Sequence, residues 1–288
     1  MKAFYILLFA FLLQGKAIAN ESVVFVKQHD GLFAASLETT VFVPEINGGP
    51  FPVVVILHGV PPTNEAQFMS RWRLINVTRE FLQRGYAVVI PMFQGHSKSG
   101  GYARPRNCYL KAEAEDSAKD VVSIVAWLEK QSWANTNQMI LLGQSYGGMI
   151  ALAYAQNPHP GFKVIANFAG GLKSINGSTC VWQQNMISAF RAYGRKTEIE
   201  TIWFYGDNDS LFPLSVVILG HEAYVKSGGK AKLVLYGQYK AGSGDAHGMF
   251  VESNRAGRFI WAPVIFGAAK EKGMPTEIVY SQFMNSYQ

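Results

Sequence analysis

Short apolar runs alternate with helical patterns along most of this chain, and this alternation constrains the fold more than any other feature. Unbroken apolar runs are typical of strands that are buried on both faces. They occupy residues 51–59, 86–93, 138–143, 163–171, 201–206 and 231–237. Apolar residues at helical spacing fall at 71–85, 110–131, 146–156, 214–226 and 254–272. Strands that alternate with helices predict βαβ units, and so an α/β fold with a mostly parallel central sheet and helices on both faces.

Two extended segments, 21–28 and 33–45, precede the first buried run and suit an antiparallel opening pair. Together with the later runs they predict a sheet of about eight strands. The hydrophobic share of 49% excludes a disordered chain. The length of 288 residues fits one large domain, which we expect to extend from residue 20 to residue 288.

The first 19 residues have the pattern of a cleavable signal peptide. Lys2 supplies a positive start, Ala3 to Leu13 form an apolar core, and Ala17-Ile18-Ala19 is a small-x-small cleavage site. The apolar core is about half the ~20 residues that span a bilayer. We therefore expect cleavage after Ala19, no stable membrane insertion afterwards, and a secreted or periplasmic location. An uncleaved anchor or a buried first helix are the alternatives.

Charge and cysteine content narrow the possible partners. The formal net charge is +6, and no run of five like charges occurs, which argues against a nucleic-acid partner. Two cysteines are too few for a zinc finger. In an oxidising compartment we expect Cys108 and Cys180 to form a disulfide. Two buried free thiols are the alternative.

A candidate nucleophile follows the strand at 138–143. Residues 143–147 read Gly-Gln-Ser-Tyr-Gly, and a helical pattern begins directly after Ser145. A G-x-S-x-G motif between a strand and a helix is the nucleophile elbow, in which glycines avoid a collision within a tight turn. Ligands of such sheets bind beyond the carboxyl ends of the strands. Ser145 is therefore the predicted nucleophile.

A serine nucleophile needs an imidazole base and an acid that orients it. Behind a nucleophile elbow, the order along the chain is serine, acid, histidine. Of six histidines, only His247 lies after the acid-bearing strand and in a loop at the correct edge. Two acids follow the strand at 201–206, and we prefer Asp209 to Asp207 because it lies further out. Asp245 is expected to shape the loop that carries His247.

The oxyanion of an acyl-transfer intermediate needs backbone N–H donors. One is expected from Tyr146, directly after the nucleophile. The other is expected from Val60, because Pro61 and Pro62 in the same loop have no N–H. His58 is expected to pack beside this loop.

With these residues placed, the sequence resembles an α/β-hydrolase of the dienelactone hydrolase-like group, which borders the prolyl oligopeptidase catalytic domain. The resemblance extends from about Pro52 to Met274 through VVVILHG, GQSYGG, YGDNDSLFP and AHGMF. It implies Ser145 as nucleophile, Asp209 as acid and His247 as base. It also implies hydrolysis of esters or related acyl compounds without a cofactor or metal.

The sequence departs from this group in three ways. Typical dienelactone hydrolases have a cysteine nucleophile and no signal peptide. The form GQSYGG is closer to peptidases and acyl-ester hydrolases. The chain has no room for the propeller domain of oligopeptidases.

Residues 172–198 interrupt the alternation of strands and helices and contain several aromatic residues. We expect a small lid over Ser145, tied to the 94–109 loop through Cys180 and Cys108. A plain connecting helix is the alternative.

The leading interpretation is a secreted or periplasmic serine esterase acting on a small-molecule acyl ester. A peptidase or amidase would use the same residues, with Arg104 and Arg106 available to bind a substrate carboxylate. An acyltransferase would also use this triad. A non-catalytic binding protein is the remaining alternative, and an intact set of serine, acid and histidine argues against it.

Overall fold

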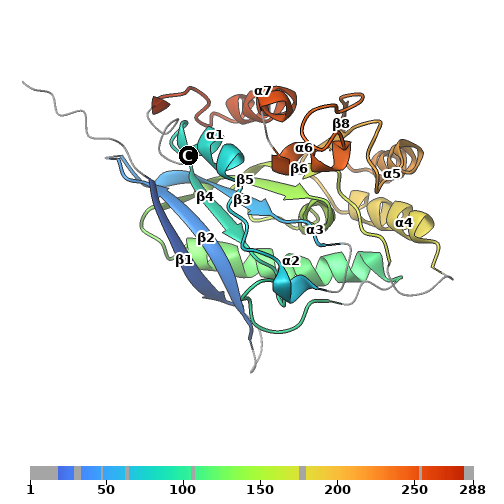
Figure 1. Ribbon diagram of the computed structural model, residues 1–288, viewed down its shortest axis with the longest axis horizontal. Helices are drawn as coiled ribbons and strands as arrows, with labels where there is room; N and C mark the ends of the chain where they lie inside the picture. Colours follow the sequence, from blue (N-terminus) through green and yellow to red (C-terminus); the bar gives the residue numbers. More distant parts are fainter. Residues whose placement is uncertain are drawn as a thin grey trace, which may run out of the picture.

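The computed structural model describes residues 19–28, 34–46, 48–61, 65–104, 108–174, 180–252 and 255–281. Within these ranges the strands form one eight-stranded sheet in the order β1-β2-β4-β3-β5-β6-β7-β8 (Figure 1). The strands are β1 (Ala19–Lys27), β2 (Ser36–Pro44), β3 (Phe51–Leu57), β4 (Ala87–Pro91), β5 (Ala134–Gln144), β6 (Phe162–Phe168), β7 (Thr201–Tyr205) and β8 (Ala231–Leu235).

The sheet is mostly parallel, as the alternation of elements predicts. Strands β1 and β2 form an antiparallel pair, and β2 lies antiparallel to β4. All pairs from β4 through β3 to β8 are parallel. The prediction of an α/β sheet of about eight strands is confirmed. The carboxyl ends of six parallel strands therefore share one edge, where the predicted site residues lie.

Helices cover both faces of the sheet (Figure 1). Helices α2, α3, α4 and α5 contribute to one buried cluster, and α1, α6 and α7 contribute to the other. The helices are α1 (Ile75–Leu82), α2 (Leu110–Leu128), α3 (Tyr146–Tyr154), α4 (Trp182–Gly194), α5 (Leu214–Lys226), α6 (Met249–Glu252) and α7 (Arg255–Glu271), with short 3-10 turns η1 (Ala66–Phe68) and η2 (Ala246–Gly248).

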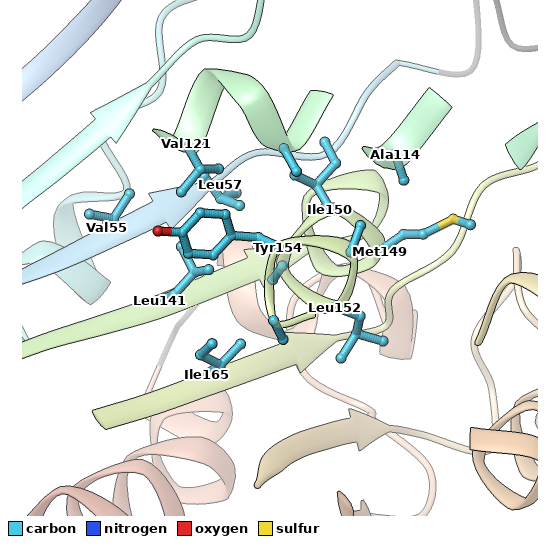
Figure 2. Packing of buried hydrophobic residues seen from close by; sticks show 14 of the residues in the cluster. Val55, Leu57, Ala114, Val121, Leu141, Met149, Ile150, Leu152, Tyr154 and Ile165 are labelled. Atoms are coloured by element: carbon cyan, nitrogen blue, oxygen red, sulfur yellow. The ribbon is translucent and has the colours of Figure 1, made fainter. Parts of the chain in front are cut away.

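The two cores divide the side chains of each central strand by alternation. In β3, Val53, Val55 and Leu57 face the cluster under α2 and α3, whereas Val54 and Ile56 face the opposite cluster. Figure 2 shows the first cluster, in which Val55 and Leu57 of β3 lie together with Val121 of α2 and Ile150 of α3. Each fully buried aliphatic side chain contributes roughly 1.5–3 kcal/mol. A sheet covered on both faces is thus a rigid base for the loops at its carboxyl edge.

Two element boundaries differ from the pattern for a local reason. The helix expected at 71–85 begins at Ile75, because Leu74 adopts a left-handed conformation with φ of 42°. The strand expected at 163–171 ends at Phe168, because Ala169 is also left-handed, with φ of 47°. Hydrophobic periodicity does not report such single-residue turns. The second of them redirects the chain next to Ser145.

The predicted signal segment falls almost wholly on residues 1–18, which lie outside the described residues. In the part of the chain that the structure describes, no helix is long and apolar enough to cross a membrane.

Candidate active site

Ser145 lies in a strained turn between β5 and α3. Its backbone has φ of 55° and ψ of −123°, in a region that side-chain-bearing residues rarely adopt, and its side chain is 7% exposed. A Cβ atom on Gly143 would lie 2.1 Å from the Gly147 carbonyl oxygen. A Cβ atom on Gly147 would lie 2.4 Å from the Leu57 carbonyl oxygen. Both glycines are required by contact, Gly143 within the turn itself, as the motif predicts, and Gly147 against the end of β3. Backbone strain of this kind costs about 1–3 kcal/mol and clusters at functional sites.

Asp209 and His247 are in direct contact. Oδ2 of Asp209 lies 3.2 Å from Nδ1 of His247, although 38 residues separate them. The other carboxylate oxygen, Oδ1, accepts the N–H groups of Leu211 and Phe212, at 2.8 and 2.9 Å. The Asp209 side chain is only 1% exposed. Asp207, the alternative acid, is exposed. With its oxygens so held, Asp209 fixes the orientation of the His247 imidazole through Nδ1.

Asp245 joins the loop that carries His247 to the loop that carries Asp209. Its Oδ1 accepts the N–H of His247 at 2.9 Å and the N–H of Ser210 at 3.1 Å, and its Oδ2 accepts the Ser210 hydroxyl at 2.6 Å. Partial burial raises the pKa of the Asp245 carboxyl, but the hydrogen bonds from Ser210 and His247 outweigh burial and lower it. The sequence predicts that Asp245 shapes the loop of His247, and its bond to the His247 N–H agrees with this. Its bonds to Ser210 in the other loop are not predicted from the sequence.

Gln144 adds another tie to the same loop. Its Nε2 donates to the carbonyl oxygen of His247 at 3.0 Å. Sequence reasoning does not identify this contact, because nothing in the motif distinguishes a glutamine that faces the base from one that packs elsewhere. Gln144, the direct neighbour of Ser145, thus helps to hold the loop of His247.

The two residues expected to supply the oxyanion donors both lie close to Ser145. Tyr146 is the first residue of α3, where N–H groups have no partner within the helix. Val60 lines the same cavity as Ser145. A Cβ atom on Gly59 would lie 2.9 Å from the Cβ of Ser145, so the loop after β3 runs directly beside the nucleophile.

His58 holds the peptide that carries the Val60 donor. Its Nε2 accepts the Phe93 N–H at 2.9 Å, and its Nδ1 lies 2.5 Å from the Gly59 carbonyl oxygen, so the proton is on Nδ1. The Gly59 carbonyl and the Val60 N–H belong to one planar trans peptide and point in opposite directions. Burial lowers the pKa of the fully buried His58 well below its usual range, and the neighbouring His96 lowers it further, against the Gly59 hydrogen bond. His58 therefore stays neutral and fixes the direction of the Val60 N–H.

The other described histidines have partners elsewhere. Nδ1 of His96 lies 3.0 Å from the Gln94 carbonyl oxygen, Nε2 of His159 lies 3.3 Å from Glu129, and Nε2 of His221 lies 3.2 Å from the Ala231 carbonyl oxygen. His29 lies outside the described residues. Among the described histidines, His247 is the one that contacts Asp209.

A cavity of about 320 Å³ lies over these residues. Its lining brings Ser145 and His247 together with the apolar side chains of Val60, Leu172, Leu211 and Phe212, and it also includes Gly171, Lys173, Ser174, Ser210 and Asp245. The Phe212 ring lies 5.5 Å from the His247 ring, centroid to centroid. The cavity thus offers an apolar wall beside the nucleophile and the base.

The segment expected as a lid divides into two parts in the structure. Residues 171–174 line the cavity, and residues 175–179 lie outside the described residues. Helix α4 then packs against α5, with Phe190 and Tyr193 fully buried. At its start, the Trp182 ring lies 6.0 Å from the Phe212 ring, so the helix supports the cavity wall.

The disulfide expected from the cysteine count is present. Cys108 and Cys180 are bonded, with their Cα atoms 5.6 Å apart and 72 residues between them in sequence. The bond ties the segment before α2 to the segment before α4.

Arg104, expected as a substrate-binding group in a peptidase, lies elsewhere. It forms ion pairs with Asp116 and Asp120 and lines a different cavity from Ser145. Arg106 lies outside the described residues. Within the described ranges, no group of three or more histidine, cysteine or acidic side chains is arranged to hold a metal ion.

Comparison with known proteins places this architecture in a family. The family model of the X-Pro dipeptidyl-peptidase (S15 family) matches residues 30–205, which is more than half of the chain. The match includes Ser145 and ends before Asp209 and His247. No curated protein matches the sequence.

Solved structures share the fold at low sequence identity. A putative dienelactone hydrolase from Klebsiella pneumoniae is 16% identical, with a TM-score of 0.61, covering 88% of this chain and 99% of its own. Acetyl xylan esterase 1 from Thermoanaerobacterium sp. is 15% identical, with a TM-score of 0.53, covering 82% and 84%.

The acylaminoacyl peptidase of Pyrococcus horikoshii is 15% identical, with a TM-score of 0.59, covering 84% of this chain but only 41% of its own. The chain thus spans less than half of that peptidase. At these identities the likeness is one of fold, and the predicted resemblance to α/β-hydrolases is confirmed at that level. The family match shows that the chain belongs to the X-Pro dipeptidyl-peptidase (S15) family, and its fold is that of the α/β-hydrolases.

Proposed function

We propose that this protein is an exported serine hydrolase that cleaves carboxylic esters through an acyl-enzyme. Ser145 is the nucleophile, His247 is the general base and acid, and Asp209 orients His247. The N–H groups of Tyr146 and Val60 bind the oxyanion. No cofactor takes part in this reaction.

One observation carries the proposal: an elbow serine and an acid-paired histidine line one cavity. The serine is held in a strained turn, the Asp209 carboxylate contacts Nδ1 of His247 at 3.2 Å, and both Ser145 and His247 line the cavity. These three residues come from separate loops of the sheet edge. Folding has no need to bring them together, whereas nucleophilic catalysis by serine requires it.

In the first half of the reaction, Oγ of Ser145 attacks the ester carbonyl carbon while Nε2 of His247 takes the hydroxyl proton. The carbonyl π electrons move to oxygen, and the two backbone N–H groups stabilise the negative charge. The tetrahedral intermediate collapses, the C–O bond to the alcohol breaks, and His247 returns the proton to the leaving oxygen. The acyl group is then bound to Ser145 as an ester.

In the second half, water takes the place of the alcohol. His247 accepts a proton from water as its oxygen attacks the acyl carbon, and the same N–H groups hold the second oxyanion. Collapse breaks the bond to Ser145, whose oxygen regains the proton from His247. The carboxylic acid leaves, and the serine and histidine return to their starting protonation states.

The cavity and the comparisons favour an ester substrate. The walls formed by Val60, Leu172, Leu211 and Phe212 suit an apolar acyl group of small to medium size. The putative dienelactone hydrolase and the acetyl xylan esterase match this chain over most of their own length. The acylaminoacyl peptidase has more than half of its chain outside the match.

A peptidase is the second candidate, because the matching family model is that of X-Pro dipeptidyl-peptidases. The two activities are separated by substrates with the same acyl group and different leaving groups. We expect hydrolysis of p-nitrophenyl butyrate that exceeds hydrolysis of butyryl p-nitroanilide by several orders of magnitude, with no release from glycyl-prolyl p-nitroanilide. Rapid cleavage of the dipeptide anilide would instead make the protein a peptidase.

Export is part of the proposal. The signal pattern of residues 1–19 and the disulfide between Cys108 and Cys180 support it, because disulfides persist in oxidising compartments. Expression with the native leader in a bacterial host is expected to yield a protein outside the cytoplasm that begins at Asn20 and has no free thiol. Full-length protein in the cytoplasm with two titratable thiols would contradict export.

A further inference from the structure

The peptide group between Ser145 and Tyr146, which carries the Tyr146 N–H, is held through its carbonyl oxygen. This peptide unit consists of the Ser145 carbonyl and the Tyr146 N–H, which point in opposite directions. The Ser145 carbonyl oxygen accepts three N–H groups, from Gly148 at 2.9 Å, Met149 at 3.2 Å and Gly171 at 3.1 Å. The first two belong to the first turn of α3. The third comes from a different loop, so an outside element also sets the direction of the Tyr146 N–H.

The loop that carries Gly171 is itself held by Tyr205. The Gly171 N–H shares its peptide with the Gly170 carbonyl, whose oxygen accepts the Tyr205 hydroxyl at 2.6 Å. The Tyr205 oxygen in turn accepts Nδ2 of Asn167 at 3.1 Å. A continuous chain of hydrogen bonds therefore leads from Asn167 through Tyr205 and two peptide units to the Tyr146 N–H. The Tyr205 hydroxyl and the peptide between Gly170 and Gly171 each accept one hydrogen bond of the series and donate the next.

This chain is buried and tightly packed. The side chains of Asn167 and Tyr205 are 0% exposed. A Cβ atom on Gly170 would lie 1.9 Å from Oδ1 of Asn167, and one on Gly148 would lie 2.3 Å from the same atom. The side-chain amide of Asn167 is therefore packed directly against Gly148 and Gly170, where no side chain larger than hydrogen fits. Within the described residues, Oδ1 of Asn167 has no hydrogen-bond partner, so only the Nδ2 side of this buried amide is satisfied.

We propose that Tyr205, supported by Asn167, is a positioning residue that aims the Tyr146 N–H at the oxyanion. The inference rests on the proposed function, because it assigns a role within the same oxyanion site. Hydrogen bonds in such a series polarise one another, and a low dielectric strengthens the effect. Burial raises the pKa of the Tyr205 hydroxyl, so it remains protonated and able to donate to the Gly170 carbonyl.

The test is Tyr205→Phe, which keeps the ring and removes the hydroxyl. The matched control is Tyr86→Phe, because Tyr86 is equally buried and its hydroxyl also donates to one carbonyl, that of Pro275 at 2.7 Å. Tyr86 directly precedes β4 and so lies at the amino ends of the parallel strands, whereas Tyr205 lies at the carboxyl end of β7. Removal of a whole oxyanion donor costs about 100-fold or more in kcat. For misdirection of one donor we expect a loss of about 10-fold in kcat with KM unchanged in Tyr205→Phe, and no loss in Tyr86→Phe.

A second readout separates positioning from general loosening of the fold. Sulfur accepts hydrogen bonds more weakly than oxygen, so an intact oxyanion hole favours an oxoester over its thionoester. We expect this preference to shrink in Tyr205→Phe and to be unchanged in Tyr86→Phe. We expect a smaller loss in Asn167→Ala, which is not additive with Tyr205→Phe because both act on one chain of contacts. Wild-type kcat in Tyr205→Phe, or a lower kcat with an unchanged oxoester preference, would overturn the inference.

An amide measurement keeps the inference testable if the proposed function fails. In Tyr205→Phe we expect the amide proton resonances of Gly171 and Tyr146 to shift and the Gly171 amide to exchange faster with solvent. Both should stay at their wild-type values in Tyr86→Phe. Unchanged Gly171 and Tyr146 amides would refute the hydrogen-bond chain. Shifted amides in Tyr205→Phe, together with a wild-type protein that hydrolyses no ester, would refute the ester hydrolase and leave the positioning geometry supported.

Discussion

Asp245 holds Ser210 by two hydrogen bonds, although 35 residues separate them in the sequence. The same carboxylate accepts the N–H of His247. Because Ser210 directly follows Asp209, Asp245 fixes the loop of the proposed acid against the loop of the proposed base. The contact between Asp209 and His247 therefore depends on a second carboxylate, that of Asp245, which takes no part in proton transfer.

Replacement of this carboxylate is expected to slow catalysis without abolishing it. We predict that Asp245→Ala lowers kcat/KM for a p-nitrophenyl ester by about 10-fold, which corresponds to roughly 1.4 kcal/mol of transition-state alignment. Ser210→Ala removes only the hydroxyl bond and should cost less. The double variant is expected to resemble Asp245→Ala, since both changes break one contact. Fully additive losses would contradict the role of Asp245 in holding Ser210 in place.

The choice between the two acids after β7 has a direct test. We predict that Asp209→Asn lowers kcat by about 10⁴-fold, because an amide at this position leaves His247 in the wrong tautomer. Asp207→Asn is the matched control, since Asp207 is exposed two residues away. Steady-state kinetics on one ester, with circular dichroism to verify folding, compares the two. A greater loss in Asp207→Asn would exchange their roles.

The tight turn around the nucleophile makes a prediction about stability. A Cβ atom on Gly147 would lie 2.4 Å from the Leu57 carbonyl oxygen, so Gly147→Ala is expected to destabilise the fold by about 1–3 kcal/mol. Gly267, exposed in α7, is the control, because a Cβ atom added there would have no neighbour within 4 Å. There alanine should stabilise the helix by up to about 1 kcal/mol. Urea unfolding measures both, and equal effects would contradict the contact.

The neutral His58 predicts how stability depends on pH. The pKa of His58 is lowered in the folded protein, whereas in the unfolded chain it is about 6.5. As the pH falls below about 6.5, the unfolded state binds a proton that the folded state does not. Folding stability contributed by this group is therefore complete above that pH and is lost below it, by up to about 1.4 kcal/mol per pH unit.

Urea unfolding between pH 5 and pH 7 measures this slope. We expect His58→Gln to flatten it, because the amide still donates to Gly59 and does not titrate. The same slope in wild type and His58→Gln would contradict the assignment.

The strands and the elbow could be predicted from the sequence because local composition determines them. Apolar runs of strand length are visible in any window, and the G-x-S-x-G pattern is contained in five consecutive residues. The order of serine, acid and histidine, together with a position in a loop at the correct edge, then selects His247 from six histidines. Asp209 is preferred to Asp207 only because it lies further from the end of the strand. The structure places Asp209 against His247.

The contacts that support the site could not be predicted, because they join residues that are distant in sequence and ordinary in type. Asp245 is close to His247 in the sequence, but its bonds to Ser210 depend on how two loops meet. Tyr205 and Asn167 occupy strand positions where any buried residue fits the pattern. Their role arises from the left-handed turn at Ala169, which periodicity does not report.

Covalent labelling by a fluorophosphonate probe tests the central claim most directly. The probe reacts with an activated serine, and the same experiment on Ser145→Ala and His247→Ala identifies the nucleophile and its base. We predict that the wild-type protein is labelled stoichiometrically on Ser145 and that neither folded variant is labelled. Folded wild-type protein that remains unlabelled, or a Ser145→Ala variant labelled as fully as wild type, would contradict the assignment of Ser145 as an activated nucleophile.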